Sequence, residues 1–147
     1  MKVDSIIFNL NDTDKLLKAV IAKIENKQHF IEVGQENIQV FSDGETCVNF
    51  NNSVRGKRVY LLSSPNTAIK ILQLNFAIDA VKRANAFEII PIIPFFPYSR
   101  QDKRDQYRGP IGAKVIAEML QNRGATSIIT FDLHAEQIEG FFNIPVN

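Results

Sequence analysis

Short runs of β-branched and aliphatic residues alternate with longer amphipathic segments along this chain, and this alternation is typical of an α/β fold. Residues 12–25 space their apolar side chains along one helical face, after several residues that favour a helix N-terminus. The apolar positions are Leu16, Leu17, Val20, Ile21 and Ile24, and the capping candidates are Asn11 to Asp14. The pattern therefore predicts an amphipathic helix near the N-terminus.

Three strands are predicted in the rest of the chain. They are residues 58–63 (RVYLLS), residues 87–96 (FEIIPIIPFF) and residues 127–131 (SIITF). The apolar continuity of the second run suits a strand that is covered on both faces. Pro91 cannot donate a hydrogen bond to a neighbouring strand, so the middle of this strand is open to question.

Two helices are predicted between these strands. The first runs from Pro65 to Arg83, and the second begins near Pro110 and ends before Gly124. The residues expected to face the core are Ile69, Leu72, Phe76 and Ala80 in the first helix, and Ala113, Ile116, Ala117 and Leu120 in the second. Because strands joined through helices of this length pair in parallel, we expect a mostly parallel sheet flanked by helices.

Composition narrows the class of protein. The 147 residues are 45% hydrophobic with a net charge of +1, which suits one globular domain with a core. Prolines keep the apolar runs shorter than the roughly 20 residues of a membrane-spanning helix, and the N-terminus lacks a signal-peptide pattern. The single cysteine, Cys47, excludes an internal disulfide and agrees with a reducing compartment. We expect a cytoplasmic domain that binds neither membranes nor nucleic acid.

Polar segments follow two of the predicted strands. SRQDKRDQYRGP (99–110) follows the strand at 87–96, and DLHAEQ (132–137) follows the strand at 127–131. Since ligands of parallel sheets bind beyond the carboxyl ends of the strands, we expect both segments at one edge. Their charged and imidazole side chains suit a metal-complexed polyphosphate. These side chains are Arg100, Asp102, Lys103, Arg104, Asp105, Arg108, Asp132 and His134.

Simpler interpretations stand beside this one. A loop of mixed charge is most often a solvated connection, and a histidine such as His134 is most often an ordinary loop residue. The sequence contains neither a Walker loop nor a GxGxxG motif, so the two commonest phosphate cradles are missing. The charge pattern alone therefore does not decide between a solvated loop and a phosphate site.

The segment FSDGETCVNF (41–50) predicts a small β-hairpin, because Asp43 and Gly44 lie between two strand-like runs. Phe41, Asp43 and Glu45 occupy alternate positions, so we expect the three side chains on one face of a strand. An aromatic ring with two acceptors suits a purine and its exocyclic amine. The alternative is that this segment only turns the chain.

Five segments, in this order, resemble the N-terminal half of the ribose-phosphate pyrophosphokinases, also called phosphoribosyl pyrophosphate synthetases. They are FSDGETCVNF, SVRGKRVYLL, DAVKRA, IIPFFPYSRQDKRDQYRGPIGAKVIAEML and ITFDLHAEQIEGFFNIPV, and RQDK and DLHAEQIEGFF are the most specific. The resemblance implies transfer of the diphosphate of Mg-ATP to the C1 hydroxyl of ribose 5-phosphate, which gives phosphoribosyl pyrophosphate and AMP. It also implies a phosphoribosyltransferase-like fold and assembly into homo-oligomers, as dimers or hexamers.

The resemblance further implies roles for single residues. Phe41, Asp43 and Glu45 would contact the adenine of ATP bound mainly by a neighbouring subunit. Arg100 and Gln101 would hold the nucleotide, with Arg100 at its phosphates.

The two polar segments complete the implied site. Asp105 and Arg108 would belong to a mobile loop, with Asp105 at the ATP site and Arg108 at a regulatory one. Asp132 and His134 match the family's magnesium-linked positions, and His134 would also lie near the ATP phosphates.

Three positions depart from the family pattern. Glu139 replaces the usual glutamine, and Asn143 and Asn147 replace aspartates of a second metal-binding patch, where amides bind Mg²⁺ less well. The resemblance also implies that the acidic loop for ribose 5-phosphate belongs to a second half that is not in residues 1–147. We therefore expect a single domain, the ATP-side half of the enzyme, which is inactive alone. The alternatives are a non-catalytic module that associates with synthetases and a product without activity.

Overall fold

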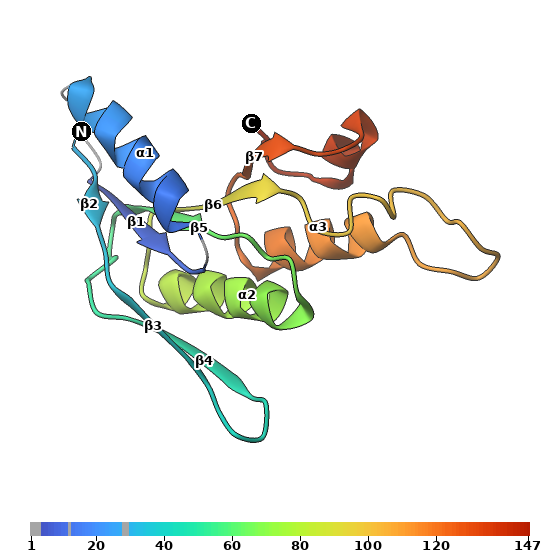
Figure 1. Cartoon of the computed structure of the whole chain (residues 1–147), viewed down its shortest axis with the longest axis horizontal. Coiled ribbons are helices and arrows are strands. Elements are labelled where there is room, and N and C mark those ends of the chain that lie inside the picture. The colour runs from blue at the N-terminus through green and yellow to red at the C-terminus, as the bar shows by residue number, and fades with distance from the viewer. Residues whose placement is uncertain (1–3, 12, 28–29) are drawn as a thin grey trace.

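A parallel sheet lies at the centre of the computed structural model (Figure 1), which describes residues 4–11, 13–27 and 30–147. Among these residues the sheet has five strands in the order β2-β1-β5-β6-β7, and every neighbouring pair is parallel. The strands are β1 (Ser5–Asn9), β2 (Glu32–Val33), β5 (Arg58–Leu62), β6 (Glu88–Phe95) and β7 (Ile129–Asp132). The predicted α/β class and the three predicted strands are confirmed, and β1 and β2 are additional.

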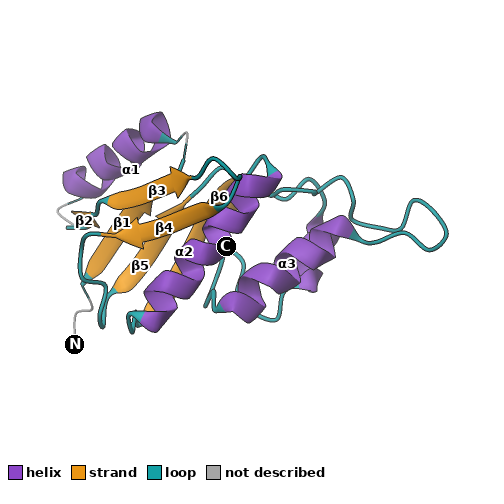
Figure 2. Ribbon diagram, turned by 90° about the horizontal axis from the view of Figure 1, so that it is seen from below, coloured by secondary structure: helices purple, strands orange, loops and turns teal. Residues whose placement is uncertain are grey.

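Helices cover both faces of this sheet (Figures 1 and 2). The helix α1 (Asp14–Asn26) lies on one face, and α2 (Ala68–Arg83) and α3 (Gly112–Arg123) lie on the other. A 3₁₀ helix, η1 (Glu136–Phe141), follows β7. The three helical segments predicted from the sequence are confirmed over the described residues, and the capping candidate Asp12 lies outside them. Within the described part of the chain, none of the helices is long and apolar enough to cross a membrane.

The main core lies between the sheet and the pair α2 and α3. Alternate strand residues such as Phe8 and Leu61 are fully buried there, and they pack with Leu74 of α2 and Leu120 of α3 in one cluster. The predicted inner face of α3 is confirmed, because Ala113, Ile116, Ala117 and Leu120 are all buried. Gly124 ends this helix with a φ of 134°, a conformation that favours glycine.

The predicted inner face of α2 is wrong. Leu72 and Phe76 are each 42% exposed, and Ile69 and Ala80 are only half-buried. The buried residues of α2 are Ile71, Gln73, Leu74, Asn75, Ala77, Ile78 and Val81. This helix is apolar around most of its circumference, so the spacing of apolar residues did not identify the side that faces the sheet. As a result, an apolar stripe lies on the surface.

Two prolines lie within the inner strand β6. The carbonyl of Ile92 accepts from the backbone N–H of Ser63 after β5, and that of Ile89 accepts from Thr126 before β7. Because successive residues of a parallel strand face opposite neighbours, Pro91 faces β7 and Pro94 faces β5. β7 pairs with β6 only from Ile92 onward, after Pro91, and β5 pairs with β6 only as far as Ile92, before Pro94. Pro91 therefore interrupts no ladder, and the strand is continuous.

A two-stranded antiparallel hairpin, β3 (Glu36–Val40) and β4 (Thr46–Phe50), lies outside the main sheet on the side of α2. Its base packs on the core through the rings of Phe8 and Phe50, whose centroids are 4.4 Å apart. The Gln73 side chain on α2 donates a 3.0 Å hydrogen bond to the Thr46 hydroxyl, and both residues are buried. The predicted hairpin is confirmed, with strands that begin earlier than expected.

The carboxyl group of Glu36 is partly withdrawn from water at the start of β3. Burial raises its pKa above the ordinary value of 4.5, and hydrogen bonds from the backbone of Glu36 and Asn9 offset only part of this effect. The nearby carboxylate of Asp14 raises the pKa further. The folded chain therefore holds this proton more tightly than the unfolded chain does.

Candidate functional site

The carboxyl ends of β6 and β7 lie side by side. Phe95 pairs with Asp132 across the two strands, and the backbone N–H of Phe96 donates to the carbonyl of Asp132 over 3.3 Å. The side chain of Gln137 also donates to the carboxylate of Asp102, which links the two polar segments directly. The structure confirms that both segments leave the same edge of the sheet.

A cleft of about 770 Å³ opens beside this edge, between the segment after β5 and the segment after β6. Arg100 and Gln101, both predicted from the sequence, line the cleft. The full lining is Ser64, Pro65, Asn66, Thr67, Phe95, Phe96, Pro97, Tyr98, Ser99, Arg100 and Gln101. The residues after β5 were missed, although the rule that selects strand ends applies to them equally.

The segment after β5 leads into the N-terminus of α2. Thr67 is the N-cap, and its side chain accepts a 3.4 Å hydrogen bond from the backbone N–H of Lys70. The start of a helix carries a partial positive charge and unpaired N–H groups, which favour anions. With the guanidinium of Arg100 in the same cleft, this part of the molecule suits phosphate.

Gln101 joins the cleft to the start of α3. Its backbone N–H donates to the carbonyl of Tyr98 over 2.8 Å, and its own carbonyl accepts from Ala113 over 3.1 Å. Its side chain occupies the space that a Cβ at Gly112 would need. Tyr98 has a φ of 56°, which is costly for a tyrosine and marks a constrained turn. Gln101 therefore shapes the loop, in addition to any contact with a ligand.

The two candidate metal residues stand at the end of β7. The carboxylate of Asp132 accepts a 2.7 Å hydrogen bond from the backbone N–H of His134, whose φ is 67°. Both side chains are exposed. No group of three or more histidine, cysteine, aspartate and glutamate residues could hold a metal ion within the described part of the chain. This pair therefore supplies at most part of a metal site.

Asp105 and Arg108 lie apart from the cleft. The loop between β6 and α3 projects far from the body of the molecule (Figure 1), and residues 103–108 are exposed throughout. The guanidinium of Arg108 lies 5.5 Å from the ring centroid of its neighbour Tyr107. The structure therefore places Arg100 and Gln101 at the base of this loop and the other two residues on its projecting part.

The hairpin residues lie elsewhere again. Phe41, Asp43 and Glu45 are exposed at the tip of the β3–β4 hairpin, which points away from the carboxyl ends of β6 and β7 (Figure 1). Their expected placement on one face of a strand is wrong, because the strands end at Val40 and resume at Thr46. They form a turn, in which the carboxylate of Asp43 accepts a 3.0 Å hydrogen bond from the Glu45 backbone.

Comparison with known proteins identifies the family. Residues 5–124 match the model of the N-terminal domain of ribose phosphate pyrophosphokinase. The chain belongs to the ribose phosphate pyrophosphokinase family. The predicted resemblance is confirmed over most of the chain.

Named relatives agree with this assignment. The chain is 41% identical over 143 residues to ribose-phosphate pyrophosphokinase 1 of Lactococcus lactis, covering 96% of this chain and 43% of the relative. It is 46% identical over 116 residues to ribose-phosphate pyrophosphokinase of Porphyromonas gingivalis, covering 78% of this chain and 37% of the relative. The chain thus spans less than half the length of the curated relatives that it matches.

Solved structures support the same fold. The phosphoribosylpyrophosphate synthetase of Mycobacterium smegmatis superposes with a TM-score of 0.88 at 34% identity, covering 98% of this chain and 47% of that one. A hypoxanthine phosphoribosyltransferase of Trypanosoma cruzi superposes with a TM-score of 0.51 at 13% identity, covering 75% of this chain and 50% of that one. The second likeness shows the fold alone, and it confirms the phosphoribosyltransferase-like architecture.

Proposed function

We propose that this chain is the ATP-binding domain of a ribose-phosphate pyrophosphokinase. The whole enzyme would transfer the diphosphate of Mg-ATP to the C1 hydroxyl of ribose 5-phosphate and release AMP. The observation that carries the proposal is the cleft beside β6 and β7, where Arg100 and the N-terminus of α2 lie together next to the Asp132 segment. This arrangement supplies positive charge for phosphates close to a carboxylate for their metal ion.

The polar groups of the cleft divide into two roles. Arg100 would bind phosphate oxygens through charge-assisted hydrogen bonds, and the first N–H groups of α2 would bind others. Asp132 would help to hold Mg²⁺, which takes one or two protein carboxylates and completes its shell with water and substrate phosphates. His134 extends from the same turn and would contact the phosphates or the waters of the metal. Mg²⁺ itself would neutralise charge on the phosphates.

The adenine would be held by a second copy of the chain. Phe41, Asp43 and Glu45 lie in the turn between β3 and β4, and this hairpin points away from the carboxyl ends of β6 and β7 of the same chain (Figure 1). A ring with neighbouring acceptors suits a purine, and a second subunit can present it to the cleft. The proposed site is therefore shared between subunits, and the active form would be a homo-oligomer. Asp105 and, in a regulatory role, Arg108 would reach the ligand only when the projecting loop closes.

We expect the isolated chain to form no phosphoribosyl pyrophosphate, because the binding of ribose 5-phosphate is assigned to a half that lies outside residues 1–147. In-line transfer requires donor, acceptor and metal to be held together. Release of AMP that depends on ribose 5-phosphate, measured with the purified chain alone, would contradict this expectation. A chain that neither binds nor turns over Mg-ATP would instead favour the non-catalytic alternative.

Calorimetry with Mg-ATP tests the cleft. We expect binding with a Kd on the order of 10⁻⁴ to 10⁻³ M, since only part of the site is present. Arg100→Ala should weaken binding by about tenfold or more, because a charge-assisted hydrogen bond is lost. Lys103→Ala is the matched control, since it removes an exposed cation from the projecting part of the same loop. Equal losses in both variants would mean that only bulk charge matters and would refute the role of Arg100.

A further inference from the structure

The chain between β5 and α2 forms one wall of the cleft and leads into the N-terminus of the helix. We call residues 63–67 the β5–α2 segment. Residues 64–67 line the cleft, whereas Ser63 is fully buried and does not. A helix leaves its first N–H groups without partners inside the helix, and here these include the N–H groups of Ala68 and Ile69. The position of the β5–α2 segment therefore decides where these groups point.

One side chain from a neighbouring strand end holds this segment. Asn11 follows β1, and the backbone N–H of Leu10 donates to the carbonyl of Leu62, at the end of β5, over 2.9 Å. The Oδ1 atom of Asn11 accepts a 2.8 Å hydrogen bond from the backbone N–H of Ser64. Its Nδ2 atom donates to the Ser63 hydroxyl over 3.2 Å. Both bonds are partly buried, and together they connect the end of β1 to the wall of the cleft.

The β5–α2 segment is short and hydrogen-bonded to itself. The backbone N–H of Asn66 donates to the carbonyl of Ser64 over 2.9 Å, which closes a tight turn. Pro65 restricts the backbone within this turn, and Thr67 follows as the N-cap of α2. A displacement of Ser64 would therefore also displace the start of the helix.

We propose that Asn11 is a positioning residue for phosphate binding. Its amide holds Ser64 so that the first N–H groups of α2 point to phosphate oxygens in the cleft that Arg100 lines. Asn11 is not among the described residues that line the cleft, so it acts through Ser64 and not by touching the ligand. The ligand class is a polyphosphate, which includes the triphosphate of Mg-ATP. The inference rests on the proposed function, because it concerns the same cleft.

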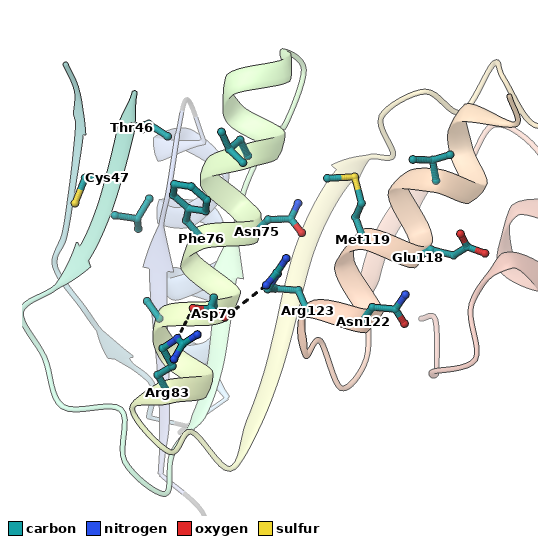
Figure 3. A pocket seen from close by; sticks show the side chains of 14 residues that line it. Thr46, Cys47, Asn75, Phe76, Asp79, Arg83, Glu118, Met119, Asn122 and Arg123 are labelled. Atoms are coloured by element: carbon teal, nitrogen blue, oxygen red, sulfur yellow. Dashed lines mark hydrogen bonds and ion pairs between the residues drawn. The ribbon is translucent and has the colours of Figure 1, made fainter. Parts of the chain in front are cut away.

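A second place on the chain gathers cations, but its geometry suits phosphate less well. Arg83 and Arg123 line a groove of about 850 Å³ between α2, α3 and β4 (Figure 3). The Nε of Arg83 lies 2.6 Å from one carboxylate oxygen of Asp79, and Nη1 of Arg123 lies 3.7 Å from the other. The carboxylate offsets part of their charge, and Arg83 lies in the last turn of α2, where the helix carries a partial negative charge. We therefore expect phosphate at the N-terminus of this helix.

NMR titration with Mg-ATP and with inorganic Mg-tripolyphosphate tests the role of Asn11. In Asn11→Ala both dissociation constants should rise by about tenfold, as when residues that orient the ligands of a metal site are removed. The N–H signals of Ala68 and Ile69 should shift on binding in the parent chain and should shift less in the variant. Arg83→Ala is the control for bulk charge, and it should leave both dissociation constants unchanged.

A matched variant separates positioning from stability. The Thr126 hydroxyl also makes two 3.0 Å hydrogen bonds to backbone groups, both of Ile89, near the amino end of β6. Thr126→Val and Asn11→Ala should both lower the urea midpoint, but only Asn11→Ala should weaken binding. Hydrogen exchange of the Ser64 N–H should become faster in Asn11→Ala and should stay unchanged in Thr126→Val.

Ser63→Ala tests whether the two hydrogen bonds of Asn11 act together. It removes the acceptor of the Asn11 amide without changing the lining of the cleft, so binding should weaken by about threefold. Asn11→Ala already lacks this bond, so the double variant should bind as Asn11→Ala does. A loss of about thirtyfold, the product of the single losses, would show that Ser63 acts independently of Asn11 and would contradict the proposal.

The other outcomes separate this inference from the proposed function. Unchanged binding in Asn11→Ala, or an equal loss in Thr126→Val, would overturn the inference while the parent chain still binds Mg-ATP. A parent chain that bound Mg-tripolyphosphate through Asn11 but did not bind Mg-ATP would support the positioning role and reject the proposed function. A parent chain that bound neither ligand would overturn both.

Discussion

The hydrogen bond between Gln73 and Thr46 fixes the hairpin to α2, and removing it should measurably loosen that attachment. The Gln73 amide donates over 3.0 Å to the Thr46 hydroxyl, which itself donates over 2.9 Å to the carbonyl of Gln39. Gln73 is 6% exposed and Thr46 is 8% exposed, so water does not readily replace a lost partner. Gln73→Met keeps the length of the side chain and removes the donor.

The expected cost follows from this burial. Gln73→Met should lower the free energy of unfolding by about 1–2 kcal/mol, because one hydrogen bond is lost and the Thr46 hydroxyl is left with an empty acceptor. Thr46→Val should lower the free energy of unfolding by a similar amount, since it leaves the buried Gln73 amide without its acceptor. In the double variant the two apolar side chains meet, so its cost should fall short of the sum of the single costs by about 1 kcal/mol.

Urea unfolding of the four proteins measures this coupling, provided that the slope with urea concentration stays constant. Gln137→Met is a control, because the hydrogen bond from Gln137 to Asp102 is exposed. It should cost less than about 0.5 kcal/mol. Single costs that add to within about 0.3 kcal/mol would show that the two side chains do not act together, and the assignment would fail.

Three further predictions concern stability. Because the pKa of Glu36 is raised in the folded chain, the free energy of unfolding should fall as pH rises from about the ordinary value of 4.5. Glu36→Gln should remove this fall. Thermal melts of both proteins across pH test this, and an equal dependence of melting temperature on pH in the two proteins would contradict the reasoning. Gly34→Ala should destabilise the chain by about 1–3 kcal/mol, since the new Cβ would overlap the buried ring of Phe8; an unchanged urea midpoint would contradict this. Leu120→Ala should cost about 2–5 kcal/mol in the same assay, because Leu120 is fully buried, and a cost below about 1 kcal/mol would mean that the site collapses around the smaller side chain.

The two helices beneath the sheet show what apolar spacing can and cannot predict. In α3 the residues Ala113, Ile116, Ala117 and Leu120 form one clear inner face, and the structure buries them. In α2 two faces are apolar, and spacing alone favoured the outer one. Local periodicity gives a helix its apolar faces, but only the position of the sheet decides which face is covered first.

Strand ends were a better guide to the candidate site than single motifs. The rule that ligands meet the carboxyl ends of parallel strands predicted from the sequence that the segments of Arg100 and Asp132 lie together. It would also have selected Ser64 and Thr67 had it been applied to β5. The hairpin tip could not be placed in this way, because Phe41 and Glu45 belong to a separate ribbon whose direction depends on its packing against α2.

The prolines of β6 have a consequence for how the chain avoids misfolding. If the register of β6 shifted so that Pro94 lay beside β5, one hydrogen bond between the two strands would be lost, because proline has no N–H. A register shift of one residue would turn Pro91 toward β5, and the same bond would be lost. Other registers of β6 are therefore destabilised by lost hydrogen bonds, whereas the native register loses none at either proline. The prolines thus keep Phe95 level with Asp132, so the two polar segments leave the sheet at the same height.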